Sequence, residues 1–165
     1  MPFLRKDVRV EQLNGGVWEL LDPVAYRDER GTYEVPAGYL TDFASVPRFV
    51  WWLVPTSGDY NAAAIVHDWL ITDWLPAGAI TSSDVDTTFR EALKALGVST
   101  PRRWLMWAGV RLGAIGNGDR RPGSLKTFPA VLGISLLALP VVLPAAVGVL
   151  ISSVVSFVYR LLLPK

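Results

Sequence analysis

The mixture of apolar and polar residues near the start of the chain predicts two strands, over residues 8–13 and 17–26. Asn14-Gly15-Gly16 between them favours the positive φ angles of a tight hairpin turn. Arg30-Gly31 predicts a second turn before a short strand over Thr32–Val35. We therefore expect a small antiparallel sheet at the N-terminus.

The spacing then changes to that of amphipathic helices, with apolar residues every three to four positions. Three helices are predicted, over residues 59–71, 82–96 and 101–115. We expect Asp59 to cap the first helix and Ser82 or Ser83 to cap the second. Pro101 suits the first helical position of the third. The predicted fold class is α+β, with a small antiparallel sheet followed by a three-helix core.

The end of the chain has neither pattern, because residues 127–159 form a run of 33 residues without a charged side chain. A helix needs about 20 apolar residues to cross a bilayer, so the run is long enough. Pro140 and Pro144 interrupt it, and each removes a backbone hydrogen bond. A single kinked span and a re-entrant helical hairpin both fit, and the short halves favour the single span. A hydrophobic hairpin buried in a protein assembly is the third interpretation.

These patterns divide the chain into a globular domain over residues 1–116, a linker over 117–126 and an apolar, membrane-seeking segment over 127–165. The last segment has only two charged residues, Arg160 and Lys165. The first 126 residues hold 14 basic and 15 acidic residues, and the whole chain has a net charge of +1. This balance does not indicate direct readout of nucleic acid, which needs a basic surface. The chain has no cysteine, which excludes disulfides and thiolate metal sites.

The candidate chemistry centres on His67, the only histidine of the chain. His67 falls on the same helical face as Ala63 and Ala64, whose small side chains allow a neighbouring helix to approach closely. Asp86 lies at the margin of the apolar stripe on the next helix, where it can reach that face. A carboxylate that orients a histidine is the arrangement of a general base.

Two further carboxylates lie close to this pair in the sequence. Asp42, in the polar loop over residues 41–48, is the third predicted catalytic residue, and its alternative role is to cap a turn. Asp68 directly follows His67 and is the candidate ligand for a hard cation that polarises an ester carbonyl. The alternative for the whole cluster is a hydrogen-bond network that joins the loop to the helices without catalysis.

Three stretches resemble a family of domains encoded by bacteriophages and prophages. They are VPAGYLTDFASVPR, AAAIVHDWL and SSDVDTTFREALKALGV, and in order and spacing the resemblance covers roughly residues 30–116. The resemblance implies a phage origin, often in the virion or its tail, and it brings no activity with it.

A more distant resemblance is to the two central helices of secreted phospholipase A2. His67 and Asp68 on one helix, and Asp86 with Phe89 on the next, are similar to that pair. The resemblance implies that His67 is the general base, that Asp86 orients it and that Asp68 binds calcium. The glycine-rich calcium loop of that family does not precede this helix, and no other cofactor is expected.

Two functions follow from these observations. The first is a virion-associated phage tail protein that acts at the host envelope, inserts its C-terminal segment in the membrane and carries a lipase-like hydrolytic site at His67. The second is a minor tail component without catalysis. Lipid membrane, other tail proteins and further copies of the chain are the expected partners, and virion and host membrane the expected locations. A third interpretation is a lysis-stage membrane protein.

Overall fold

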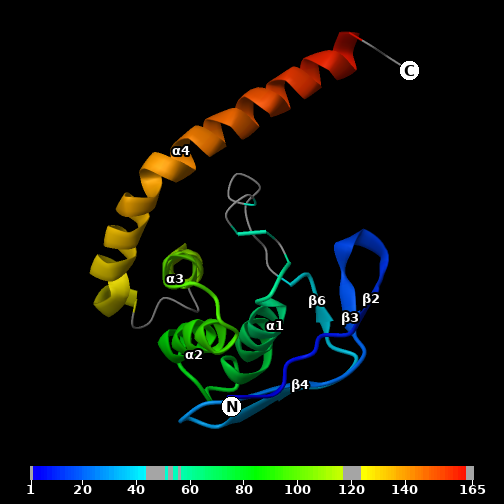
Figure 1. Cartoon of the computed structure of the whole chain (residues 1–165), viewed down its shortest axis with the longest axis vertical. Helices are drawn as coiled ribbons and strands as arrows, with labels where there is room; N and C mark the ends of the chain where they lie inside the picture. Colours follow the sequence, from blue (N-terminus) through cyan, green and yellow to red (C-terminus); the bar gives the residue numbers. More distant parts are fainter. Residues whose placement is uncertain (1, 44–50, 52–53, 56, 117–123, 163–165) are drawn as a thin grey trace.

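The computed structural model describes residues 2–43, 51, 54–55, 57–116 and 124–162. It confirms the α+β class, with short strands in the first part of the chain and helices in the rest (Figure 1). The strands are β1 (Phe3–Arg5), β2 (Val10–Gln12), β3 (Trp18–Leu20), β4 (Val24–Arg27), β5 (Thr32–Val35) and β6 (Leu40–Thr41). The helices are α1 (Asn61–Trp69), α2 (Ser82–Ala95), α3 (Thr100–Gly116) and α4 (Ser124–Leu162).

The strands form two antiparallel sheets of three strands each, where the sequence predicted one sheet. The strand orders are β1-β4-β5 and β2-β3-β6. The expected strand over residues 17–26 is divided into β3 and β4, because Pro23 between them has no N–H for a sheet. Gly15 and Gly16 have φ angles of 78° and 82°, so the expected positive-φ turn is present between β2 and β3.

Two of the expected helix caps are wrong. Tyr60, and not Asp59, occupies the N-cap position of α1, and the side chain of Asn61 accepts the Gly58 N–H at 2.7 Å. Thr81 caps α2 in place of Ser82 or Ser83, because Thr81 is the last extended residue and its Oγ1 accepts the Asp84 N–H. A cap must have extended backbone, and both serines are already helical.

The sheet β1-β4-β5 lies against α1, and α2 packs beside α1 (Figure 1). The third helix, α3, then packs against α2. The alanines at positions 62–64 of α1 are buried in the common core, together with Ile65 and Val66. This arrangement places His67 of α1 and Asp86 of α2 at the contact between the two helices.

The apolar segment is a single helix and not a hairpin. Within the described residues, α4 is the one helix with a stretch long and apolar enough to cross a membrane, over Lys126–Leu162. It bends along its length, and Pro140 and Pro144 lie within it (Figure 1). The expected linker over 117–126 is too long at its C-terminal end, because α4 begins at Ser124; residues 117–123 lie outside the described part.

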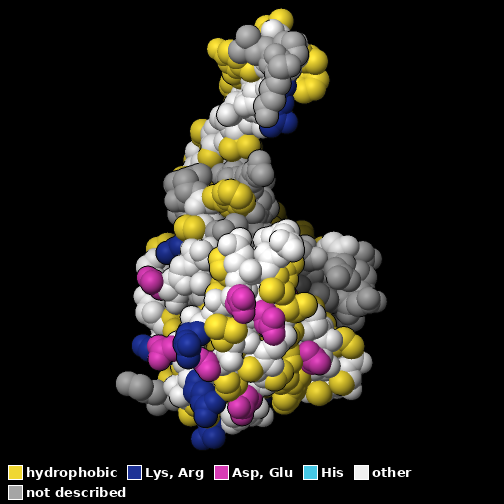
Figure 2. Space-filling view, turned by 90° about the vertical axis from the view of Figure 1, so that its right-hand side faces the viewer, with side chains coloured by type: hydrophobic (Ala, Val, Ile, Leu, Met, Phe, Trp, Pro, Cys, Tyr) yellow, Lys and Arg dark blue, Asp and Glu magenta, His cyan; other side chains and the backbone are white. Residues whose placement is uncertain are grey.

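The first turns of α4 belong to the globular domain. Val131 is fully buried and packs with Trp107 and Ala108 of α3, and Ile134 packs against the same cluster. The rest of α4 projects from the domain, and its surface is largely apolar, with few charged residues (Figures 1 and 2). A globular part and an apolar part are therefore joined within one helix.

Candidate functional site

The expected contact between His67 and Asp86 is present. His67 comes from α1 and Asp86 from α2, and Nε2 of the ring lies 2.8 Å from Oδ1 of the carboxylate. Asp86 is fully buried, and His67 is 8% exposed. The imidazole ring also packs on Phe89, with 4.6 Å between ring centroids. The helix pair therefore holds the imidazole from two sides.

A third residue, Arg111 of α3, completes this group. Its Nη1 donates to Asp86 Oδ2 at 2.9 Å and to Ser82 Oγ at 3.4 Å, and neither ion of the Arg111–Asp86 pair is exposed. Sequence reasoning missed Arg111. A signal was present, because Arg111 follows Trp104, Trp107 and Ala108 at the helical spacing of the buried face of α3.

The network reaches a fourth helix. Nε of Arg111 donates to Oγ1 of Thr127 in α4 at 3.2 Å. The buried guanidinium of Arg111 therefore bonds to side chains of α2 and α4. Asp86 of α2 in turn bonds to His67 of α1. We name His67, Asp86, Arg111 and Thr127 the four-helix network.

The network determines which nitrogen of the imidazole ring donates a hydrogen bond. A carboxylate has only acceptors, so Nε2 of His67 must donate its proton to Asp86, and Nδ1 is then the unprotonated nitrogen. Within the described part of the chain, no residue forms a hydrogen bond with Nδ1. The buried charges of Asp86 and Arg111 compensate each other.

Asp68 lies on a different side of α1 from this network. Its Oδ2 accepts the Tyr39 hydroxyl at 3.2 Å, and Tyr39 also contacts Thr72 Oγ1. Burial raises the pKa of Tyr39 to about 12, so the hydroxyl keeps the proton that it donates. Burial also raises the pKa of the Asp68 carboxyl, and the negative charge of Asp42 adds to this effect.

Asp42 is therefore coupled to Asp68, while the imidazole of His67 bonds to Asp86. In the turn that holds Asp42, Thr41 Oγ1 accepts the Phe43 N–H at 2.9 Å. Phe43 has a φ angle of 65°, which is rare for a residue with a side chain. Residues 44–48 of the loop lie outside the described part.

The expected calcium site lacks a ligand set in the described residues. Among them, no group of three or more histidine, cysteine, aspartate or glutamate side chains is placed to hold a metal ion. Calcium takes six to eight oxygen ligands, and Asp68 already accepts the Tyr39 hydroxyl. We derive no chemical step through a metal at Asp68.

The raised pKa of Asp68 gives a testable prediction. Below the ordinary pKa of 3.8 the carboxyl is neutral in the folded and unfolded chain, and as pH rises through the higher folded pKa, the folded state becomes less stable. We expect Asp68→Asn, which keeps an acceptor for Tyr39, to raise the melting temperature at pH 7 but not at pH 3. Thermal unfolding across this pH range measures the difference, and parallel profiles for both proteins would contradict the prediction.

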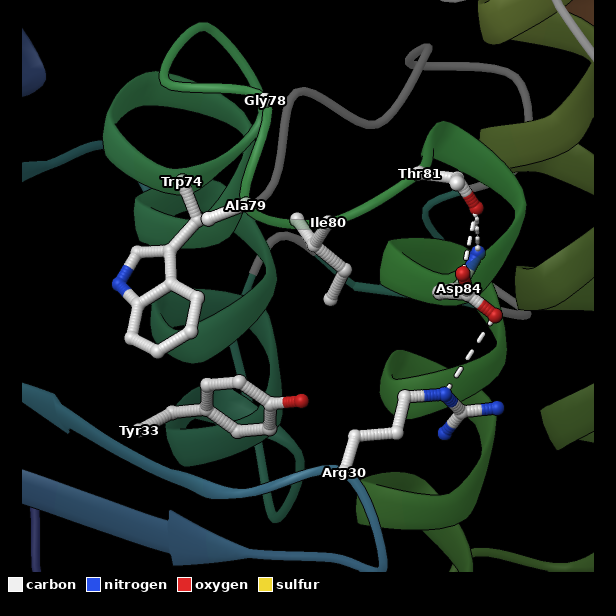
Figure 3. Close-up of a pocket in the computed structure, with 8 residues that line it drawn as sticks. All are labelled: Arg30, Tyr33, Trp74, Gly78, Ala79, Ile80, Thr81 and Asp84. Carbon is white, nitrogen blue, oxygen red and sulfur yellow. Dashed lines mark hydrogen bonds and ion pairs between the residues drawn. The ribbon is translucent and has the colours of Figure 1, made fainter.

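A cavity of about 210 Å³ lies at a separate place (Figure 3). The π-helix Leu70–Trp74 that follows α1 forms one wall, where the Leu75 N–H bonds to the Leu70 carbonyl at 2.9 Å. The lining residues are Arg30, Tyr33, Trp74, Gly78, Ala79, Ile80, Thr81 and Asp84. Tyr33 and Trp74 pack edge to face, and Arg30 pairs with Asp84 at 3.4 Å. The larger side chains that line this cavity therefore already contact one another, Tyr33 with Trp74 and Arg30 with Asp84.

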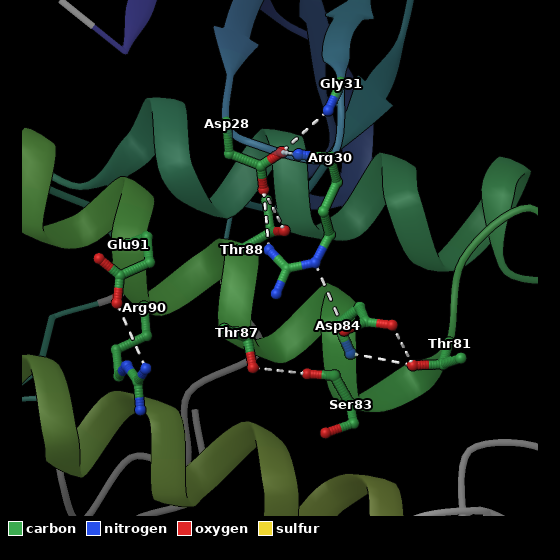
Figure 4. A network of polar contacts seen from close by, with 10 residues as sticks. All are labelled: Asp28, Arg30, Gly31, Thr81, Ser83, Asp84, Thr87, Thr88, Arg90 and Glu91. Carbon is green, nitrogen blue, oxygen red and sulfur yellow. Dashed lines mark hydrogen bonds and ion pairs between the residues drawn. The ribbon is translucent and has the colours of Figure 1, made fainter.

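The same surface carries a second polar network, between the β4–β5 turn and α2 (Figure 4). Asp28 accepts Thr88 Oγ1 at 2.8 Å and the backbone N–H groups of Arg30 and Gly31. Burial alone would raise the pKa of Asp28, but these hydrogen bonds outweigh it and lower that pKa. This network fastens the sheet β1-β4-β5 to α2.

These observations define the class of the protein: an α+β domain whose helices share a buried ionic network, continued by a helix that can cross a membrane. The chain belongs to a family described as "Protein of unknown function (DUF1353)", whose model matches residues 18–110. No curated protein and no solved structure matches the chain. The matched segment ends one residue before Arg111, so the four-helix network extends beyond it.

Proposed function

We propose that this protein is a membrane-anchored component of a bacteriophage particle that acts at the host cell envelope. One observation carries the membrane part: α4 has an uncharged run of 33 residues, and none of its most apolar window is buried in the fold. An apolar surface of this extent is unstable in water. The phage part is supported by the sequence resemblance over residues 30–116.

The geometry of α4 is consistent with a span. Residues 127–134 pack on α3, and the remaining residues 135–162 project from the domain (Figure 1). At about 1.5 Å per residue, this projecting part is roughly 42 Å long. The hydrocarbon core of a bilayer is about 30 Å thick, so the projecting part alone is long enough, with some tilt.

Charged residues in the projecting part should abolish the anchoring. Val147 and Ile151 lie near its middle and are exposed. We expect Val147→Asp with Ile151→Asp to release the full-length chain from membranes, because each central aspartate costs about 2.5–3.5 kcal/mol on insertion. Carbonate extraction and flotation with liposomes measure the partition. The matched control, Val147→Ala with Ile151→Ala, should remain in the membrane fraction.

A soluble wild-type chain would refute the anchoring outright. The phage assignment needs a separate measurement, namely detection of the chain in purified particles by mass spectrometry. Its presence there supports a virion component, and its absence from particles but presence in late-infection membranes supports the lysis-stage interpretation.

For the four-helix network, the geometry favours the non-catalytic role. Asp86 is shared with Arg111, so part of its charge is already compensated and less is left to stabilise an imidazolium. His67 is also nearly sealed, and it lines neither the cavity beside Trp74 nor the one beside Asp59. The network therefore supports a structural function, which is to hold the helices around the base of α4.

A hydrolytic site at His67 remains the second candidate, favoured by one observation. Asp86 fixes Nε2, so Nδ1 is available as a base, and the neighbouring Asp68 is held with a raised pKa at the cost of stability. The test is hydrolysis of phospholipid in mixed micelles by the wild type and by His67→Asn. A loss of at least a hundredfold supports the enzyme. Equal rates, or an inactive wild type, exclude it.

A further inference from the structure

The leucines of α4 are distributed unevenly around the helix. Six leucines lie between residues 132 and 150. Five of them are separated by four, three, four and seven residues in turn, and Leu137 is outside this series. Phe157 continues the series seven residues after the last leucine. The members are Leu132, Leu136, Leu139, Leu143, Leu150 and Phe157, which we name the leucine stripe.

This spacing averages 3.5 residues per turn and is the heptad pattern of paired helices. At about 100° per residue, the six side chains of the leucine stripe lie within roughly 60° of one another around the helix axis. Val141, Val149 and Val155 fall on other faces, and Val154 falls at the edge of the leucine stripe. A lipid environment accepts leucine and valine on any face, so it does not account for this segregation.

Within the described residues, the leucine stripe is largely exposed. Its members are between 39% and 64% exposed, whereas the α4 residues that contact α3 are Thr127, Val131 and Ile134. The two faces lie more than about 90° apart by the same helical periodicity. Docking on α3 therefore leaves the leucine stripe free.

The prolines of α4 also leave the leucine stripe open. Pro140 and Pro144 each directly follow a stripe leucine, so they lie roughly 75° and 115° from its centre around the axis. Their rings bend the helix but do not stand between the stripe and a partner. In a heptad with Leu136 and Leu143 at the a positions, the two prolines occupy positions e and b.

The stripe begins before the part of α4 that can lie in a membrane. Leu132 is 46% exposed, and it lies in the turns of α4 that pack on α3 through Val131 and Ile134. Lipid tails do not cover a side chain at that level when residues 135–162 span the bilayer. A protein surface that carries the same leucine stripe can cover Leu132 at that level.

We propose that α4 pairs with α4 of a second copy of this chain, in parallel, through the leucine stripe. A seam of equal residues at heptad spacing is complementary to itself, and helix pairs in membranes commonly cross at the small left-handed angle that heptads favour. Because both copies insert in the same direction, the pair is parallel. The parallel orientation rests on the membrane anchoring proposed above, while the pairing rests on the stripe.

The absence of cysteine makes cross-linking a direct test, because each introduced thiol is the only one in the chain. Leu143→Cys and Leu150→Cys place the thiol on the leucine stripe, and Leu137→Cys and Val155→Cys place it on other faces. We expect mild oxidation of full-length chains in membranes to give at least tenfold more disulfide-linked dimer for the two stripe variants.

Equal cross-linking at all four positions, or stronger cross-linking off the stripe, would overturn the proposal. So would the absence of dimer from a chain found in the membrane fraction, and this result would leave the anchoring intact. A chain found in the soluble fraction would refute the anchoring, and the same four variants would then test the pairing there.

A second set of variants measures the affinity without thiols. Leu136→Ala, Leu143→Ala and Leu150→Ala together should lower energy transfer between labelled copies by at least half. The control set, Leu137→Ala, Val141→Ala and Val155→Ala, removes side-chain volume from other faces and should leave the transfer unchanged. Equal losses in both sets would contradict pairing through the leucine stripe.

Discussion

Arg111→Met is expected to destabilise the domain by about 3–5 kcal/mol, since it leaves the fully buried Asp86 without its cation. Methionine retains much of the apolar stem, so the loss reports chiefly on the charge. Urea unfolding of the full-length chain in detergent micelles, followed by tryptophan fluorescence, measures the change in free energy of unfolding.

A double variant separates the charge from the volume. Adding Asp86→Asn removes the uncompensated charge and keeps an acceptor for the imidazole of His67. We expect the double variant to be more stable than Arg111→Met alone, because the two residues interact directly and their effects are not additive. If the double variant is the less stable of the two, the pair does not act as a compensated ion pair.

A chain that ends at Pro122 is expected to be less stable than a chain that ends at Ala138, by about 3–6 kcal/mol. The shorter chain loses Val131, whose burial contributes about 1.5–3 kcal/mol, and the hydrogen bond from the charged Arg111 to Thr127, which contributes about 1.5–3 kcal/mol. It also exposes Trp107 and Ala108. Thermal unfolding of both chains measures the difference.

The chain that ends at Ala138 is the matched control, because it lacks most of the projecting part of α4 but keeps the packed turns. Equal melting temperatures for the two chains would mean that α4 does not contribute to the domain. The same pair also bears on the membrane proposal, since both chains should leave the membrane fraction.

Together, the contacts show that one network joins the core helices to α4. His67, Asp86 and Arg111 come from three helices, and Arg111 also holds Thr127 at the base of α4. These hydrogen bonds hold the base of α4 against the core helices, and they thereby set the direction in which α4 leaves the domain. In a pair of chains joined through the leucine stripe, this connection would also fix how the two domains face each other.

Several features were predictable because they depend on nearby residues. The turn at Gly15 and Gly16, the strand β5 and the three core helices all follow from local spacing and turn chemistry. The approach of Asp86 to His67 followed from two helical faces that each had to be buried. The division of the sheet and the cap at Thr81 were missed, since several neighbouring residues satisfy the same local rule.

The sequence by itself determined that an α+β domain precedes an apolar helix, because periodicity and the absence of charge are properties of consecutive residues. It also placed the His67–Asp86 contact. Only the tertiary structure decided that Arg111 shares the carboxylate and that Val131 belongs to the core. Helix packing decides which residue pairs with a buried ion. Asp86 and Arg111 are 25 residues apart, and nothing in that separation predicts that they meet.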